Sequence, residues 1–384
     1  MILREAYIPE HSADTPRRLR IALVAARYFP YMGGTETHIH EVSRRMSEAG
    51  HDVTILTSDV SGKLPAQEAV NGVSVRRFAA YPRGMDLYYT PQLYRAVTEG
   101  GWDVVHCQGY HTFVAPMAML AAQRAKIPYV VTFHSGGHSS RVRNAVRGIQ
   151  RNALRPLIKD AAQLIGVSEF EADFFSRGLH LPRERFVVIP NGAQLPEVQT
   201  PAVRNSAEPL ILSVGRLEKY KGHQRVLRAM PRVLTAFPKA RLRIVGSGPY
   251  EKSLHELTDQ LGLGGCVEIA AIPPGERSAM AMLISEAALV TLISDYEAHP
   301  VTVMEALALR RPVLVADNAG LAELARRGLV PCVPADCNDE CLAAAIVEQL
   351  RHPFISDAAV EFPTWEACTQ KLLNVYAQVV GTPA

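Results

Sequence analysis

Short apolar runs alternate with helix-like segments twice along this chain, and this alternation limits the possible folds more than any other feature. The first series starts at residues 20–26 and ends at 186–189, and the second runs from 210–214 to 312–316. Strands that alternate with helices form parallel sheets with helices on both faces. A chain of 384 residues is long enough for two such units. The sequence therefore predicts an α/β protein with two doubly wound, parallel-sheet domains that face a cleft.

The segments around the two series predict the domain boundaries. Residues 1–19 are polar, lack the apolar centre of a secretory signal and are expected to be a disordered lead-in. Residues 20–192 form the predicted N-terminal domain, and 193–208, which lack periodicity, form the linker. Residues 209–363 form the predicted C-terminal domain. The helix-like segment 364–384 is expected to pack back on the N-terminal domain.

Composition narrows the class of protein. Apolar residues make up 48% of the chain and charged residues 21%, as in soluble globular proteins. No apolar run approaches the roughly 20 residues that cross a bilayer. The net charge of +3 is too small to argue for a nucleic-acid partner. The six cysteines are expected to be reduced, and the spacing of Cys332, Cys337 and Cys341 is unusual for zinc. We therefore expect a cytoplasmic protein without a metal site.

One stretch joins the end of an apolar run to a helix-like run and carries two carboxylates. Glu297 lies before the helix start and Glu305 lies inside the helix, while Pro300 suits the first turn, where an amide hydrogen has no partner. The helix-start amides of Val301 and Thr302 suit a phosphate, and the carboxylates suit hydroxyl groups. This stretch predicts a site for a ligand that carries both groups.

Two glycine-containing turns precede that stretch in the second half. Gly215 and Arg216 leave a predicted strand together with Lys221, an arrangement that suits an anionic diphosphate. A solvated basic loop is the alternative. Gly246 and Gly248 follow another predicted strand, but they fall short of the full dinucleotide fingerprint.

Two features of the first half point toward the same cleft. Gly33 and Gly34 lie between the first strand and its helix, where glycine serves either a tight turn or the close approach of a ligand. His134 ends a predicted strand that faces the cleft. Such a histidine acts either in catalysis or as a hydrogen-bonded structural residue, and the sequence leaves both readings open.

Arginines recur every four residues on one predicted helix that also has an apolar side. This pattern is typical of helices that lie on anionic membranes or grip an anionic acceptor. An ordinary solvated face on a core-packed helix is the equal alternative. The four arginines are Arg143, Arg147, Arg151 and Arg155.

In their order along the chain, these motifs resemble the retaining glycosyltransferases of family four, which have two Rossmann-like domains in the GT-B arrangement. The resemblance runs from about residue 20 to 380. The matching motifs are Gly33-Gly34-Thr35-Glu36, His134, residues 188–192, Gly215-Arg216, Lys221-Gly222, residues 246–249 and the E-x7-E pair Glu297 and Glu305.

The resemblance implies a UDP- or GDP-sugar donor on the second domain and a glycan, lipid-linked or small-molecule acceptor on the first. Arg216 and Lys221 would neutralise the departing diphosphate in place of a metal ion. Glu305 would hold the ribose, Glu297 the transferred sugar, and His134 would lie near the anomeric centre. The implied enzyme is a retaining, metal-independent glycosyltransferase without a cofactor.

The residues expected in that site form two groups. The predicted catalytic residues are His134, Arg216, Lys221 and Glu297. The predicted donor-binding residues are Gly33, Gly34, Gly215, Gly246, Gly248, His299, Pro300, Val301, Thr302 and Glu305.

The chain also departs from the family pattern. Ala298, Ala271 and Ala319 stand at usual glycine positions, His299 replaces an apolar or aromatic residue, and Arg310 replaces the glycine at a helix end. Donor preference is therefore the least transferable property. Alternatives are a sugar-nucleotide epimerase, a sugar phosphorylase on the same fold, or a non-catalytic sugar-nucleotide-binding protein.

Overall fold

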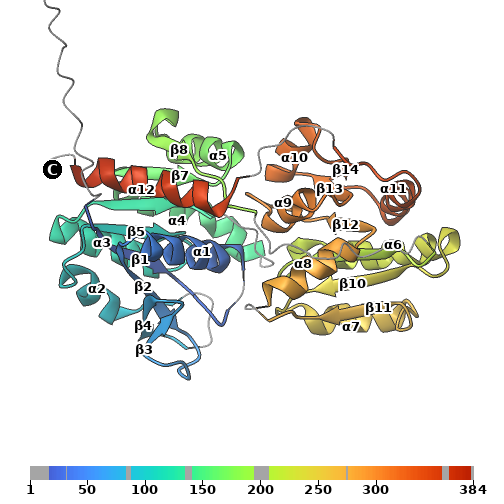
Figure 1. The fold of residues 1–384 in the computed structure, drawn as a ribbon, viewed down its shortest axis with the longest axis horizontal. Helices are drawn as coiled ribbons and strands as arrows, with labels where there is room; N and C mark the ends of the chain where they lie inside the picture. The colour runs from blue at the N-terminus through green and yellow to red at the C-terminus, as the bar shows by residue number, and fades with distance from the viewer. Residues whose placement is uncertain are drawn as a thin grey trace, which may run out of the picture.

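The computed structural model describes residues 17–31, 33–83, 88–134, 141–193, 207–273, 276–356 and 363–381, with side chains except those of 141–147. Two α/β units lie side by side in Figure 1, each built around its own sheet. The predicted fold class, two doubly wound domains with parallel sheets, is therefore confirmed.

The N-terminal sheet is organised around β1 (Arg20–Ala25), whose apolar residues are buried after the first position. Parallel neighbours flank it on both sides, β2 (Asp52–Asp59) and β5 (Val104–Gln108), which explains why the whole run is apolar. The sheet order is β3-β4-β2-β1-β5-β6-β7-β8. The remaining strands are β3 (Gln67–Val70), β4 (Val73–Ala79), β6 (Tyr129–Thr132), β7 (Gln163–Gly166) and β8 (Phe186–Val188).

Helices cover this sheet because each has an apolar stripe at helical spacing. In α1 (Gly34–Glu48) the buried side chains of Ile39, Val42 and Met46 recur three or four residues apart. The antiparallel edge strand β3 is half exposed and was not predicted. The other helices are α2 (Pro91–Thr98), α3 (Val114–Ala125), α4 (Arg141–Lys159), α5 (Glu169–Leu179) and the short η1 (Arg183–Arg185).

The C-terminal sheet is organised in the same way around β9 (Leu210–Val214). Its neighbours are β10 (Arg241–Val245) and β12 (Leu289–Leu292), and the order is β11-β10-β9-β12-β13-β14. The short β14 was also not predicted. The other strands are β11 (Val267–Ala270), β13 (Val313–Asp317) and β14 (Cys332–Pro334). The helices are η2 (Lys219–Lys221), α6 (His223–Ala236), α7 (Glu251–Gln260), α8 (Arg277–Glu286), α9 (Val301–Ala308), α10 (Ala319–Arg326) and α11 (Asp339–Arg351).

The last helix, α12 (Trp365–Gly381), lies on the N-terminal unit and packs against α1 (Figure 1). Its Trp365, Leu372 and Tyr376 are buried in the N-terminal core. The chain therefore crosses between the units twice. The two crossings lie together, because the amide of Ala193 donates to the carbonyl oxygen of Pro363 at 2.9 Å.

The chain ends and the linker are only partly described. Residues 1–16 of the predicted lead-in and 194–206 of the predicted linker lie outside the described residues. Leu19 is buried and Arg17 pairs with Asp103 at 2.7 Å, so the folded unit begins a few residues before the predicted boundary at 20. Within the described ranges, no helix has the length and apolar character needed to cross a membrane.

Candidate active site

Lys221 and Glu297 meet at the carboxyl edge of the C-terminal sheet. The Lys221 Nζ atom lies 2.5 Å from Glu297 Oε1, and the hydroxyl of Ser294 donates to the same oxygen at 2.9 Å. The loops after β9 and β12 can approach this closely because Gly222 has no side chain. A Cβ atom on Gly222 would lie 1.9 Å from the carbonyl oxygen of Ile293. The φ of Gly222 is 79°, a value that glycine adopts readily.

The Lys221–Glu297 pair is largely shielded from solvent. The side chains are 15% and 12% exposed, respectively. Burial works against the charge of Lys221, yet the adjacent Glu297 carboxylate raises the pKa of Lys221 above its usual value. Lys221 is therefore fully charged at neutral pH, and Glu297 is its present counter-ion.

Glu305 has a cationic partner that the sequence did not predict. It lies on α9 with its side chain 3% exposed, and the guanidinium of Arg277, at the start of α8, donates to its Oε1 atom. Burial raises the pKa of Glu305, and Arg277 opposes that rise. Arg277 therefore helps to keep the Glu305 carboxylate ionised in a buried position.

Arg216 lies where loops of the two domains approach each other. Its side chain is 44% exposed, and one guanidinium nitrogen donates to Glu218 Oε1 at 3.0 Å. Glu36, from the first turn of α1, faces it from the other domain. Burial raises the pKa of Glu36, while Arg216 and Arg27 lower it.

Gly33 and Gly34 begin α1 beside Glu36. A Cβ atom on Gly33 would lie 2.5 Å from Glu36 Oε2, whereas one on Gly34 would meet nothing within 4 Å. No side chain caps this helix. The first turn thus offers open space at Gly34 and a carboxylate next to Gly33.

Gly246 and Gly248 let one loop pack on another. A Cβ atom on Gly246 would lie 1.9 Å from the Gly215 carbonyl oxygen, and one on Gly248 would lie 2.5 Å from that of Leu217. The amide of Leu217 donates to the Ser247 carbonyl at 2.9 Å. These glycines thus support the loop that carries Arg216, and their contact with a donor stays a prediction.

Three histidines of the N-terminal unit lie close together, and of these His38 and His106 are buried and His134 is half-buried. His134 follows β6 with a φ of 43°, and its Nε2 atom lies 2.6 Å from Gln108 Oε1. The ring of His38, from α1, lies 4.7 Å from the His134 ring. Behind them, His106 is hydrogen-bonded to Tyr376 at 2.5 Å and to Thr132.

Burial keeps these imidazoles neutral. It lowers the pKa of His134 well below its usual value, that of His38 to about 4 and that of His106 to about 3. His38 was missed by the sequence analysis. The signal available was a histidine on the apolar stripe of α1, next to Ile39.

The loop before α9 places Pro300 at the helix N-cap, so the helix itself begins at Val301. No side chain caps its first turn, which contains Thr302, and amides there suit an anion. Gly320 lies against this loop, since its Cβ atom would be 2.3 Å from the Ala298 carbonyl oxygen. His299 lines a neighbouring cavity between the two domains.

Two of the family's glycine positions have left-handed backbone here without glycine. Arg310 has a φ of 51° and Ala319 a φ of 48°. Each position costs on the order of 1 kcal/mol relative to glycine. Ala319 begins α10, next to the loop before α9 that carries Glu297, so this strain lies close to the predicted donor site.

Two arginines of α4 contact α5, although Arg155 is exposed and Arg151 is half-buried. The Arg155 Nε atom donates to the Leu179 carbonyl at 2.6 Å, at the end of α5, and Arg151 lies 5.7 Å from the Phe174 ring centre. The side chains of Arg143 and Arg147 lie outside the described residues. Half of the predicted basic face therefore supports α5.

Family comparisons agree with this arrangement. A family model for Glycosyltransferase Family 4 matches residues 32–195, and one for Glycosyl transferases group 1 matches residues 197–359. Together they account for most of the chain. The protein is a glycosyltransferase of family four.

Relatives and solved structures extend over nearly the whole glycosyltransferase. It is 28% identical to a phosphatidyl-myo-inositol mannosyltransferase of Mycolicibacterium smegmatis, over 94% of this chain and 95% of the relative. Sucrose-phosphate synthase from Thermosynechococcus elongatus shares the fold with a TM-score of 0.73 at 19% identity, covering 94% and 99%. HepE from Anabaena, solved with UDP and glucose, has a TM-score of 0.67 at 17% identity, covering 94% and 98%.

Proposed function

We propose that this glycosyltransferase is a retaining, metal-independent enzyme that moves a hexosyl group from a UDP- or GDP-sugar to a hydroxyl group. The observation that carries the proposal is the largely shielded Lys221–Glu297 pair, 2.5 Å apart, with Arg216 on the adjacent loop. A lysine with a raised pKa and an arginine supply two permanent positive charges at one edge of the sheet.

In this proposal the nucleotide sugar binds to the C-terminal unit, on the side that faces the N-terminal unit. Glu305 accepts hydrogen bonds from the ribose, and the uncapped start of α9 faces a phosphate or a sugar oxygen. Glu297 holds a hydroxyl of the transferred sugar while Lys221 turns to the diphosphate. That the HepE structure was solved with UDP and glucose supports a nucleotide sugar as donor.

In the proposed chemistry, the bond from the anomeric carbon to the phosphate oxygen breaks, and a new bond to the acceptor oxygen forms on the same face. The departing phosphate oxygen accepts the proton of the acceptor hydroxyl. Negative charge grows on the diphosphate, and Arg216 and Lys221 stabilise it by hydrogen bonds and charge. This is the role a divalent metal would otherwise take.

The acceptor binds to the N-terminal unit, on the side where the uncharged histidines lie. His134, uncharged at neutral pH, bonds a sugar hydroxyl near the anomeric centre without adding charge to the site. The relationship to a phosphatidyl-myo-inositol mannosyltransferase supports a lipid-linked acceptor among the glycan, lipid and small-molecule classes. A cytoplasmic location, at the inner face of a membrane, belongs to the same proposal.

Nucleotide release tests the function directly. The protein is incubated with a panel of UDP-, GDP- and ADP-sugars and with glycan, lipid-linked and small-molecule acceptors, and release is followed with and without a chelator. We expect chelator-resistant release with a UDP- or GDP-sugar and retention of the anomeric configuration in the product. Release that stops with the chelator would refute metal independence, and an inverted product would refute retention.

Vesicle binding tests the membrane part separately. Binding to anionic vesicles that weakens with salt is expected, and Arg143→Gln with Arg147→Gln should reduce it. Equal binding to neutral and anionic vesicles would contradict the basic-helix interpretation.

A further inference from the structure

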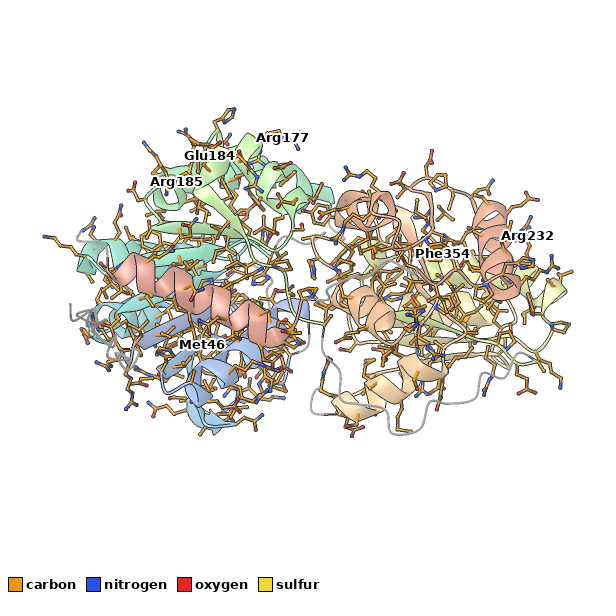
Figure 2. The ribbon with its side chains drawn as sticks, turned by 45° about the horizontal axis from the view of Figure 1, so that its top comes forward. Met46, Arg177, Glu184, Arg185, Arg232 and Phe354 are labelled. Carbon is orange, nitrogen blue, oxygen red and sulfur yellow. The ribbon has the colours of Figure 1, made fainter. Side chains whose placement is uncertain are left out.

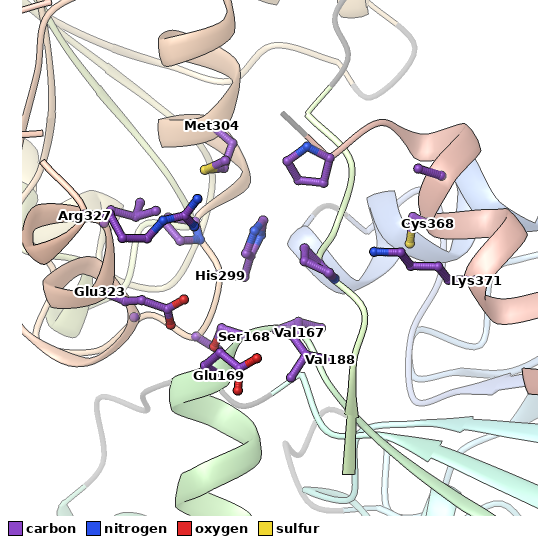
Figure 3. A pocket seen from close by; sticks show the side chains of 17 residues that line it. Val167, Ser168, Glu169, Val188, His299, Met304, Glu323, Arg327, Cys368 and Lys371 are labelled. Carbon is purple, nitrogen blue, oxygen red and sulfur yellow. The ribbon is translucent and has the colours of Figure 1, made fainter. Parts of the chain in front are cut away.

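A cavity of about 290 Å³ lies between the two domains and α12 (Figure 3). Its walls come from the start of α5, the loop before α9, the end of α10 and the first turns of α12. Arg216, Lys221, Glu297 and Glu305 are not among the residues that line it. The cavity is therefore adjacent to the proposed donor site but built from other side chains.

The carboxylates at this cavity already have partners. Glu323, on α10, accepts a hydrogen bond from the amide of Phe170 at 3.3 Å, across the domain boundary. Glu169 is paired with Arg183. Part of the negative charge around the cavity is thus neutralised within the protein.

The nitrogen atoms that face the cavity do not have such partners. Arg327 and Lys371 are exposed and make no side-chain ion pair or hydrogen bond with other described residues. The Nδ1 atom of His299 is buried without a partner. Figure 3 shows Arg327 and Lys371 reaching toward His299 from opposite sides. Two cations and an unsatisfied imidazole nitrogen converging on one cavity favour an anion.

We propose that this cavity binds a small phosphate-bearing polyol, with its phosphate between Arg327 and Lys371 and in contact with His299. The cavity volume is close to the lower end of ordinary ligand pockets, roughly 300 Å³, so it has room for more than a phosphate alone. Hydroxyl groups of the ligand would meet Ser168 and Glu323, which also line the cavity.

Occupancy would tie the two domains together. Lys371 belongs to α12, which packs on the N-terminal unit, whereas Arg327 and His299 belong to the C-terminal unit. A ligand held by all three favours the domain arrangement in which they face one another. Because His299 is part of the loop that carries Glu297, the ligand would also bias the shape of the donor loop.

The test is a binding titration with inorganic phosphate, glucose 6-phosphate and glucose at constant ionic strength, followed by calorimetry. We expect glucose 6-phosphate to bind more tightly than phosphate, and glucose not to bind. Arg327→Gln and Lys371→Gln should each weaken glucose 6-phosphate binding, and together they should weaken it at least tenfold. The matched control is Arg228→Gln with Arg232→Gln on α6, whose exposed Arg232 lies far from the N-terminal unit in Figure 2.

A second variant separates this cavity from the proposed donor site, which also attracts phosphate. Binding that survives Arg216→Gln and is lost in the Arg327/Lys371 pair supports the proposal. Loss in Arg216→Gln with retention in the pair would overturn it, as would no binding to the unaltered protein or an equal loss in the control. None of these outcomes depends on glycosyl transfer, so the proposed function stands or falls separately.

Discussion

The two walls of the cleft use different kinds of side chain. On the N-terminal side, His38 and His106 are buried and His134 is half-buried, and burial lowers the pKa of all three, so they are uncharged at neutral pH. On the C-terminal side, charges are present but matched within the protein, as in the pairs Lys221–Glu297 and Arg277–Glu305. One wall offers neutral hydrogen-bonding groups and the other offers charge.

This difference fits a reaction in which charge changes on one partner only. A departing diphosphate gains negative charge, so fixed cations near it stabilise the transition state more than the ground state. An acceptor hydroxyl needs orientation, which neutral imidazoles can supply. It also follows that a donor must replace internal partners on the charged wall, because Lys221 and Glu305 already have theirs.

The largest expected effect comes from removing charge from the C-terminal wall. Lys221→Ala should lower kcat by about 100-fold or more, because one hydrogen-bonding group directed at the charge that develops in the transition state contributes on that scale. Initial rates of nucleotide release measure this loss. Lys219→Ala, an exposed neighbour on the same short helix, is the control and should stay near the original rate. Equal activity of the two variants would contradict the role of the charged wall.

The neutral wall makes a pH prediction. The pKa of buried His38 is about 4 when folded and about 6.5 when unfolded, so the unfolded chain binds the proton first as pH falls. The contribution of the neutral His38 to the free energy of unfolding is fully present above about pH 6.5 and is lost as the pH falls toward 4. Between pH 7 and 5, this one group lowers the free energy of unfolding by about 2 kcal/mol.

Denaturant unfolding of His38→Gln at the two pH values checks this. The variant should lose less stability on acidification than the original protein, whatever its stability at pH 7. His255→Gln, an exposed position on α7, serves as control and should keep the original pH dependence. An unchanged slope in His38→Gln would mean that the N-terminal wall is not held neutral by burial at this position.

The parallel sheets were predictable because a strand that is buried on both faces is a continuous apolar run in the sequence. β1 and β9 read as continuous apolar runs, and the turns that follow them carry the glycines and cations. The short edge strands β3 and β14 are not continuous apolar runs of that length. β3 is half exposed, and β14 has only three residues. Their pairing depends on the neighbouring strand more than on their own sequence.

Partners within the site were harder to predict for a related reason. Glu297 and Glu305 are recognisable by their spacing, but Arg277 meets Glu305 only because α8 and α9 flank the same part of the sheet. His38 and His134 come from different β–α units, which strand order brings together. Contacts between loops follow from the order of strands, which local patterns do not encode.

A smaller effect is expected where one charge holds another in place. Arg277→Met leaves Glu305 in a buried position that raises its pKa, so the carboxyl tends to become protonated and loses part of its capacity to accept from a ribose. We expect KM for the donor to rise roughly tenfold, with a smaller change in kcat. Steady-state kinetics with Arg232→Met as control measure this split. An unchanged KM would remove Glu305 from the donor site.

The smallest effect concerns Glu36, a carboxylate of the N-terminal unit that lies near Arg216. Glu36 lies against Gly33 at the start of α1, where a phosphate of the donor would also be attracted. Its charge therefore competes with the diphosphate for Arg216. Glu36→Gln removes that charge while keeping its shape, and pyrophosphate and UDP should bind a few-fold more tightly, an effect of roughly 0.5–1 kcal/mol at a partly exposed site.

Calorimetry with the two ligands at fixed salt measures the change, with the exposed Glu99→Gln as control. Glu36→Asp keeps the charge and should not tighten binding. If Glu36→Gln weakens binding instead, the carboxylate positions Arg216 for the donor and does not compete with it. The N-terminal wall would then take part in holding the diphosphate, and the division between a neutral wall and a charged wall would fail at this residue.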